Sequence, residues 1–129
     1  MAQQINRTTG LAVIAAMCGL AFAAPAAGST ADAAAGQKVF ERCAGCHSTA
    51  PGENKLGPSL AGVVGRKSGS EVGYDYSPAL KAANITWDEQ SLDKFLTNPS
   101  ANIPGIKMFI SVPDATDRQN VIAYLKTLQ

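Results

Sequence analysis

A five-residue segment, Cys43-Ala44-Gly45-Cys46-His47, constrains this chain more than any other feature of its sequence. Two cysteines separated by two residues and followed at once by histidine form the pattern that attaches c-type haem. Cysteines three positions apart near a helix end reach one side of the helix, where both thiols can bond to one porphyrin. The adjacent imidazole then lies beneath the iron, for which it is a good axial ligand. The segment predicts one covalent haem held by Cys43 and Cys46, with His47 on its iron.

The first 26 residues are predicted to be a signal peptide. Residues 1–10 are polar and carry Arg7, residues 11–24 hold no charge, and small residues follow, which is the pattern of an export signal. The uncharged run is shorter than the roughly 20 residues that a membrane-spanning helix needs. We expect cleavage between residues 23 and 27 and one domain over residues 27–129. An uncleaved membrane anchor is the alternative, and lipidation of Cys18 is a weaker one because Met17 suits that reaction poorly.

Removal of the leader leaves few residues that can bind a metal. The chain has three cysteines, three methionines and one histidine, of which Met1, Met17 and Cys18 leave with the leader. A zinc site would require four ligands, and the mature chain offers two cysteines and one histidine. A disulfide or a thioredoxin-like redox pair remains the alternative for the two cysteines. A thioredoxin-like fold requires a strand–helix–strand context around the two cysteines. No run of residues with the period of a strand lies near them in this sequence.

Met108 is the one other soft donor in the mature chain, so elimination makes it the sixth iron ligand. A lone methionine is more often core filler, but filler lies on a helical stripe and Met108 follows Pro104-Gly105 in a loop. Ligation by His47 and Met108 would fill both axial positions and leave no open site for substrate, which favours electron transfer over catalysis. The alternative is a haem protein in which Met108 is displaced and which acts as a peroxidase or a gas sensor.

The remainder of the chain predicts an all-α fold, with short helices joined by loops rich in glycine and proline. A first helix runs from about Asp32 to Cys43, and a loop-rich stretch follows over residues 51–73. Ser77 and Pro78 open a short helix as its N-cap and first residue. There is no internal repeat.

Two capping boxes predict the later helices. Residues 86–89 form the first box, and the helix that it opens stops at Asn98-Pro99. Residues 116–119 form the second box, which opens the last helix. The apolar faces of these two helices are Leu92, Phe95 and Leu96 on the first, and Val121, Tyr124, Leu125 and Leu128 on the second.

With these motifs in this order, the chain resembles the class I cytochrome c family, which includes mitochondrial-type cytochrome c and its bacterial periplasmic relatives. The resemblance runs from Ala34 to Leu128. It implies a small cytochrome c fold wrapped around one covalent haem c, in a soluble carrier of single electrons that is not an enzyme. It also implies that Gly36 and Phe40 on the first helix pack against the last helix, since glycine lets two helices cross closely.

Four further residues gain roles from the resemblance alone. The carbonyl of Pro58 is expected to accept a hydrogen bond from the ligand histidine, which fixes its tautomer. The side chain of Arg66 is expected beside a haem propionate. The hydroxyl of Tyr76 and the indole N–H of Trp87 are expected to reach the propionates.

Three departures from the family remove polar groups near the expected haem. Phe95 stands where many relatives have a tyrosine that hydrogen-bonds the methionine sulfur. Ile106 replaces a threonine that often helps a propionate, and Leu80 replaces an asparagine of the mitochondrial members. We therefore expect a drier haem environment, in which Phe95→Tyr would change the midpoint potential.

The expected partners are redox proteins in the bacterial periplasm: a donor such as a cytochrome bc complex and an acceptor such as a terminal oxidase or reductase. The chain has 11 basic and 10 acidic side chains, and loss of Arg7 with the leader brings the mature charge to about zero. No polybasic run is present, so nucleic acid is not an expected partner. Stable membrane insertion is not expected, and we expect a monomer. Mitochondrial members dock through a lysine ring, to which Lys38, Lys55 and Lys107 are the candidates here, but acids such as Glu53 and Glu71 offset the lysines.

Overall fold

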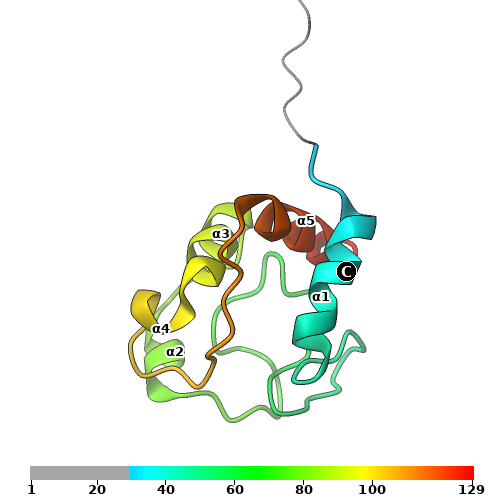
Figure 1. Ribbon diagram of the computed structural model, residues 1–129. Coiled ribbons are helices and arrows are strands. Elements are labelled where there is room, and N and C mark those ends of the chain that lie inside the picture. The colour runs from blue at the N-terminus through cyan, green and yellow to red at the C-terminus, as the bar shows by residue number, and fades with distance from the viewer. Residues whose placement is uncertain (1–29) are drawn as a thin grey trace, which may run out of the picture.

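The computed structural model describes residues 30–129, in which five helices are joined by loops and no strand is present (Figure 1). The helices are α1 (Ala33–Ala44), α2 (Pro78–Ala82), α3 (Glu89–Thr97), α4 (Pro99–Asn102) and α5 (Ala115–Lys126). The one piece of β pairing in these residues is an isolated bridge between Lys67 and Thr86. The expected all-α class is confirmed. The predicted signal peptide lies outside the described residues and stays a prediction.

Helix α1 begins where the sequence predicts because Asp32 caps it. One carboxylate oxygen of Asp32 accepts hydrogen bonds from the backbone N–H groups of Ala34 (2.8 Å) and Ala35 (3.3 Å). These contacts satisfy donors that the first turn of a helix leaves free. The buried face of α1 is formed by Gly36, Val39 and Phe40, whose three- and four-residue spacing places them on one side.

Helices α1 and α5 cross in close contact, and Gly36 makes the contact possible. A Cβ atom at position 36 would lie 1.9 Å from the carbonyl oxygen of Asn120, a distance that no real side chain tolerates. The rings of Phe40 and Tyr124 pack beside this crossing, with centroids 5.3 Å apart. Figure 1 shows the two helices together near the start of the described chain. The predicted packing of the first helix against the last is confirmed.

Both predicted helices are present, but the capping boxes predicted at their starts are wrong, because other residues cap them. The N-cap of α3 is Asp88, whose carboxylate accepts from the Ser91 N–H (2.7 Å) while Ser91 Oγ accepts from the Asp88 N–H (2.8 Å). Thr86 is instead paired with Lys67 through the backbone. The N-cap of α5 is Asp114, which accepts from the Asp117 N–H at 2.8 Å, two residues before the predicted cap.

Other boundaries agree with the sequence. Ser77 caps α2 with Pro78 in its first turn, and α3 ends at Thr97, just before Asn98 and Pro99. The short α4 that follows was not predicted. Leu128 was predicted on the apolar face of the last helix, but it lies beyond the end of α5. Ile122 was not predicted there, and it is buried on that face.

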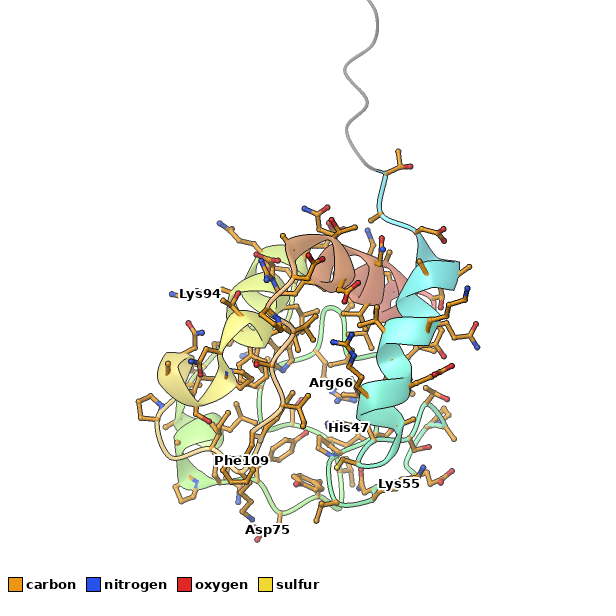
Figure 2. All side chains as sticks on the ribbon, in the orientation of Figure 1. His47, Lys55, Arg66, Asp75, Lys94 and Phe109 are labelled. Carbon is orange, nitrogen blue, oxygen red and sulfur yellow. The ribbon has the colours of Figure 1, made fainter. Side chains whose placement is uncertain are left out.

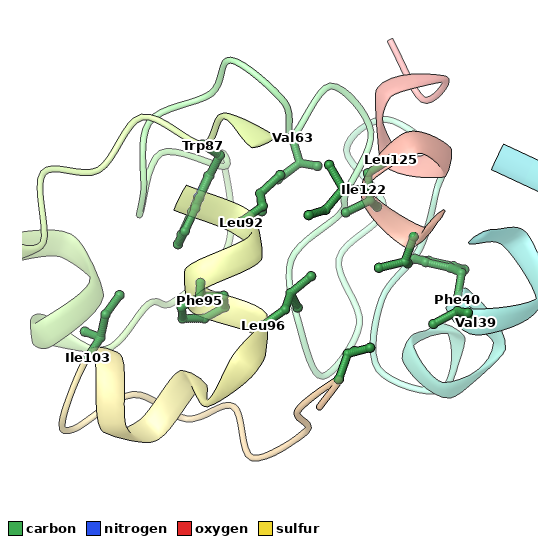
Figure 3. Close-up of a cluster of buried hydrophobic side chains, with 12 residues drawn as sticks. Val39, Phe40, Val63, Trp87, Leu92, Phe95, Leu96, Ile103, Ile122 and Leu125 are labelled. Carbon is green, nitrogen blue, oxygen red and sulfur yellow. The ribbon is translucent and has the colours of Figure 1, made fainter. Parts of the chain in front are cut away.

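The core joins α1, α3, α5 and the loops into one apolar cluster (Figure 3). Its members are Val39, Phe40, Val63, Trp87, Leu92, Phe95, Leu96, Ile103, Val112, Val121, Ile122 and Leu125. The rings of Trp87 and Phe95 pack at 4.9 Å between centroids. Among residues 30–129, no helix has the length and apolar character needed to cross a membrane.

Candidate functional site

A cavity of about 450 Å³ lies between α1, α3, α5 and the two long loops. This volume is within the range of protein sites for small molecules and cofactors. Most of its lining is apolar, and its walls come from segments that are far apart in the sequence. Every residue that the sequence singled out as a site residue lines it: Cys43, Cys46, His47, Pro58, Arg66, Tyr76, Trp87 and Met108.

The two cysteines reach the cavity from the end of α1. The helix ends at Ala44, and the backbone N–H groups of Cys46 and His47 both donate to the Cys43 carbonyl, at 3.0 Å and 2.9 Å. This tight turn brings the three side chains to the same cavity. The cysteines are not joined to each other, and burial raises the pKa of the Cys43 thiol above its ordinary value. Both thiols are therefore available for bonds to another group.

His47 is oriented by the carbonyl of Pro58. The His47 Nδ1 atom lies 2.7 Å from that oxygen, and a carbonyl can only accept, so Nδ1 carries the proton. In the neutral ring Nε2 then has a free lone pair. Burial lowers the pKa of the imidazole, although the hydrogen bond to Pro58 opposes this shift. The ring is thus held neutral with the nitrogen that a metal would require left available.

Gly57 provides the space for this ring. A Cβ at position 57 would lie 2.4 Å from His47 Cε1, 2.7 Å from Nδ1 and 2.9 Å from Nε2. The backbone of residue 57 therefore packs flat against the imidazole, and any side chain there would displace it.

Arg66 gives the cavity a basic group. Its Nη1 donates to the Ala61 carbonyl (3.0 Å) and to Glu71 (2.5 Å), and its Nη2 donates to the Ser59 carbonyl (2.8 Å). Its Nε atom is buried and has no hydrogen-bond partner. A buried N–H without an acceptor is uncommon in folded proteins. This orphaned donor fits a ligand that carries an acidic group.

Tyr76 and Trp87 lie on the cavity wall, and both are buried (6% and 7% exposed). The Tyr76 hydroxyl accepts a hydrogen bond from the backbone N–H of Glu71 at 3.3 Å, so its own proton remains free for another acceptor. Burial raises the pKa of this phenol, which keeps it a donor at neutral pH. Their expected contacts with propionates stay predictions.

The three residues that depart from the family pattern also line the cavity. They are Leu80, Phe95 and Ile106. None of these side chains has a polar atom, and Phe95 is 9% exposed. The apolar wall is consistent with the dry environment expected from the sequence.

Met108 approaches from the loop between α4 and α5. Gly105 turns the chain there with φ of +91°, a conformation that favours glycine. The Ser100 hydroxyl donates to the Met108 carbonyl at 3.2 Å. Lys107 Nζ lies 2.9 Å from the Asp75 carbonyl oxygen, which ties this loop to the loop before α2. Met108 thus lies in a loop and lines the cavity, and its ligation of an iron stays a prediction.

Sequence reasoning missed four residues at this site. Glu71 was counted only as a charge that offsets lysines, yet it pairs with Arg66 inside the protein. Leu56, Phe109 and Ile110 line the cavity but are 79%, 84% and 46% exposed. Figure 2 shows Phe109 and Asp75 near the same edge of the molecule, while Lys94 projects away from it. The sequence did carry a signal for the exposed patch of Leu56, Phe109 and Ile110, because these apolar residues lie in segments predicted to be loops.

The donor set fits a haem. Two thiols, one neutral imidazole and one thioether line a single apolar cavity, and an unpartnered guanidinium N–H offers a contact for a carboxylate. Haem is flat, apolar and edged by two carboxylates, and its iron takes imidazole and thioether ligands. The residues therefore match each chemical part of that group.

Comparisons with known proteins lead to the same class of molecule. Residues 33–129 match the sequence model of the family described as Cytochrome c. The chain is 51% identical over 100 residues to cytochrome c of Euglena viridis, covering 76% of this chain and 98% of that protein. It is 48% identical to cytochrome c2 of Rhodoblastus acidophilus, covering 73% and 90%. The solved structure of cytochrome cH from Methylobacterium extorquens aligns with a TM-score of 0.71 and 45% identity, covering 74% of this chain and 98% of that one.

Proposed function

The chain belongs to the cytochrome c family, and from that premise we propose that it is an exported monohaem cytochrome that carries single electrons in the bacterial periplasm. Members of this family are electron carriers rather than enzymes, they bind haem c covalently and they act with redox partners. The observation that carries the proposal is the convergence of Cys43, Cys46, His47 and Met108 on one cavity.

Each of these side chains has a defined task in the proposal. Cys43 and Cys46 would hold the haem through thioether bonds, and His47 and Met108 would ligate its iron. Haem, when bound, supplies a one-electron iron couple whose potential is high with histidine and methionine ligands. Pro58 holds the His47 ring in one tautomer, while Arg66, Tyr76 and Trp87 bind the propionates. The apolar walls exclude water, which limits reorganisation when the charge on the site changes.

Haem attachment is tested by a haem-staining gel of the exported protein, since covalent haem survives denaturation. We expect the stain in the natural chain and its loss when Cys43 and Cys46 are both replaced by alanine. Cys18→Ala is the matched control, because this third cysteine lies in the predicted leader, and it should keep the stain. A natural chain without stain would overturn the proposal in favour of a thiol–disulfide protein.

Axial ligation by Met108 is tested by absorption spectroscopy. We expect the ferric protein to show the charge-transfer band of a sulfur–iron bond, and Met108→Leu to lose it at nearly constant side-chain volume. Carbon monoxide should bind the reduced variant but not the reduced natural chain. Ready binding to the natural chain would contradict the carrier proposal and favour the displaceable-ligand alternative.

The proposal of export rests on the leader pattern of residues 1–26. The proposed partners are a donor such as a cytochrome bc complex and an acceptor such as a terminal oxidase or reductase. The protein is proposed to act as a monomer. Fractionation of cells that express the full chain tests the location: the haem-stained band should appear in the periplasmic fraction, shortened by 23–26 residues. A full-length band in the membrane fraction would indicate a retained anchor.

The surface at the cavity mouth supports docking through apolar contacts. Leu56 and Phe109 are largely exposed there. The nearby positive charge is partly offset, because the one carboxylate of Asp75 lies 3.4 Å from Lys107 and 3.8 Å from Lys81. Rates of electron transfer to such partners should therefore depend weakly on ionic strength, in contrast to association that is steered by a charged patch.

A further inference from the structure

Arg66 and Glu71 form an ion pair that is largely withdrawn from solvent. The Arg66 Nη1 and Glu71 Oε2 atoms lie 2.5 Å apart, and the two side chains are 16% and 14% exposed. In each of the other ion pairs within residues 30–129, one side chain is at least 46% exposed. The charges of this pair are therefore the least screened by water and salt.

The pair is joined to the cavity on both of its sides. The Arg66 side chain lines the cavity, and its unpartnered Nε is available to a carboxylate there. The Glu71 backbone N–H donates to the hydroxyl of Tyr76, which also lines the cavity. Glu71 thus contacts both polar groups that can bind an acidic ligand edge: its carboxylate contacts Arg66, and its backbone N–H contacts Tyr76.

We infer that Glu71 is a positioning residue that lowers the midpoint potential of the haem iron by holding the Arg66 guanidinium and cancelling its charge. The inference rests on the proposed function, since it requires haem in the cavity. Oxidation adds one positive charge to the site, and a negative charge in a poorly screened environment favours that form. Without Glu71, the unbalanced guanidinium would favour the reduced form.

The test is a redox titration of the holoprotein with Glu71→Gln. The amide has nearly the size of the carboxylate and keeps an oxygen that accepts from Arg66, so the change removes charge rather than the contact. We expect the midpoint potential to rise. Glu53→Gln is the matched control, because it makes the same change of charge at an exposed residue. The shift from Glu71→Gln should exceed that of the control and persist at high ionic strength, where an exposed charge is screened.

Three results would overturn the inference: no shift, a downward shift, or a shift equal to that of the control at high salt. If the glutamine variant does not accumulate as holoprotein, Glu71→Ala removes the same charge and should raise the potential as well. If neither variant accumulates, the Arg66–Glu71 pair is needed for folding rather than for setting the potential, and this result would also overturn the inference. Haem content and the sulfur–iron band, measured on the same samples, report on the proposed function in the natural chain. The difference in midpoint potential between the variants tests the role of Glu71 separately.

Discussion

The His47 Nδ1 atom and the Pro58 carbonyl oxygen are 2.7 Å apart, and this one contact decides which nitrogen of the ring can bind a metal. Because the carbonyl has no proton to give, the hydrogen lies on Nδ1 and the lone pair lies on Nε2. The neighbouring Gly57 packs against the same ring without leaving space for a side chain. The peptide of residues 57 and 58 therefore acts as a rigid support for the imidazole.

Replacing Gly57 by alanine should displace that imidazole. The added Cβ would lie 2.4 Å from His47 Cε1, so the ring must move and its hydrogen bond to Pro58 must weaken. We expect a lower yield of holoprotein and a changed midpoint potential in what remains. Gly45→Ala is the control, because its φ is −64° and a Cβ there would meet nothing within 4 Å. Equal effects of the two substitutions in a redox titration would contradict this account.

Phe95→Tyr should change the midpoint potential by placing a hydroxyl in the apolar cavity that Met108 also lines. A hydroxyl buried without a partner costs about 1–3 kcal/mol, so it would contact the methionine sulfur or admit water. Phe109→Tyr adds the same group to a ring that is 84% exposed, and it should leave the potential close to its natural value. An unchanged potential in Phe95→Tyr would refute the hypothesis of a drier haem environment.

Gly36→Ala should destabilise the fold by forcing α1 and α5 apart. The new Cβ would lie 1.9 Å from the backbone oxygen of Asn120, which cannot move without its helix. Overpacking of this kind costs about 1–3 kcal/mol in the free energy of unfolding. Denaturant unfolding of the holoprotein measures this cost. Gln37→Ala, at an exposed position of the same helix, is the control and should change stability by no more than about 0.5 kcal/mol. Similar stabilities of the two variants would contradict a close helix crossing.

The site could be predicted from the sequence largely because its donors are rare. The motif of residues 43–47 pointed to His47, and elimination pointed to Met108, because it is the one methionine that remains after the leader is set aside. The residues of the Cys43–His47 segment are also neighbours in the sequence, so their spacing alone determines how their side chains are placed. By contrast, Arg66 and Glu71 meet in an irregular loop, where a separation of five residues has no periodic meaning, and their pairing could not be predicted.

The errors in the helix caps have a similar cause. Thr86 has the right residue type for a cap, but its segment is paired with Lys67, a contact between distant parts of the chain. Asp88 is the N-cap instead, because it lies two residues later, immediately before the first residue of α3. Local patterns therefore indicated that a helix begins nearby, while long-range pairing decided the residue at which it begins.

Asp88→Ala should destabilise α3 at neutral pH but have little effect in strong acid. Hydrogen bonds from the Ser91 backbone and side chain hold the pKa of the Asp88 carboxyl below its ordinary value of 3.8. Because the folded pKa is depressed, the stabilisation is complete above the ordinary value and is lost as pH falls through the folded one. Thermal unfolding across this acidic range measures the difference between variant and natural chain. A difference in Tm that stays constant into strong acid would rule out the charged carboxylate as its source.

Truncating the exposed apolar side chains at the cavity mouth should slow electron transfer with the redox partner. Leu56→Ser and Phe109→Ser remove side chains that are 79% and 84% exposed and that line the cavity. Loss of one well-placed apolar contact costs roughly 1 kcal/mol, or about fivefold in rate at low protein concentration. Val72→Ser is the control, because Val72 is 87% exposed but does not line the cavity. Stopped-flow oxidation by a terminal oxidase, repeated over a range of salt concentrations, measures both effects. A normal rate in the Leu56 and Phe109 variants, together with a steep salt dependence in the natural chain, would show that lysines rather than this apolar patch direct docking.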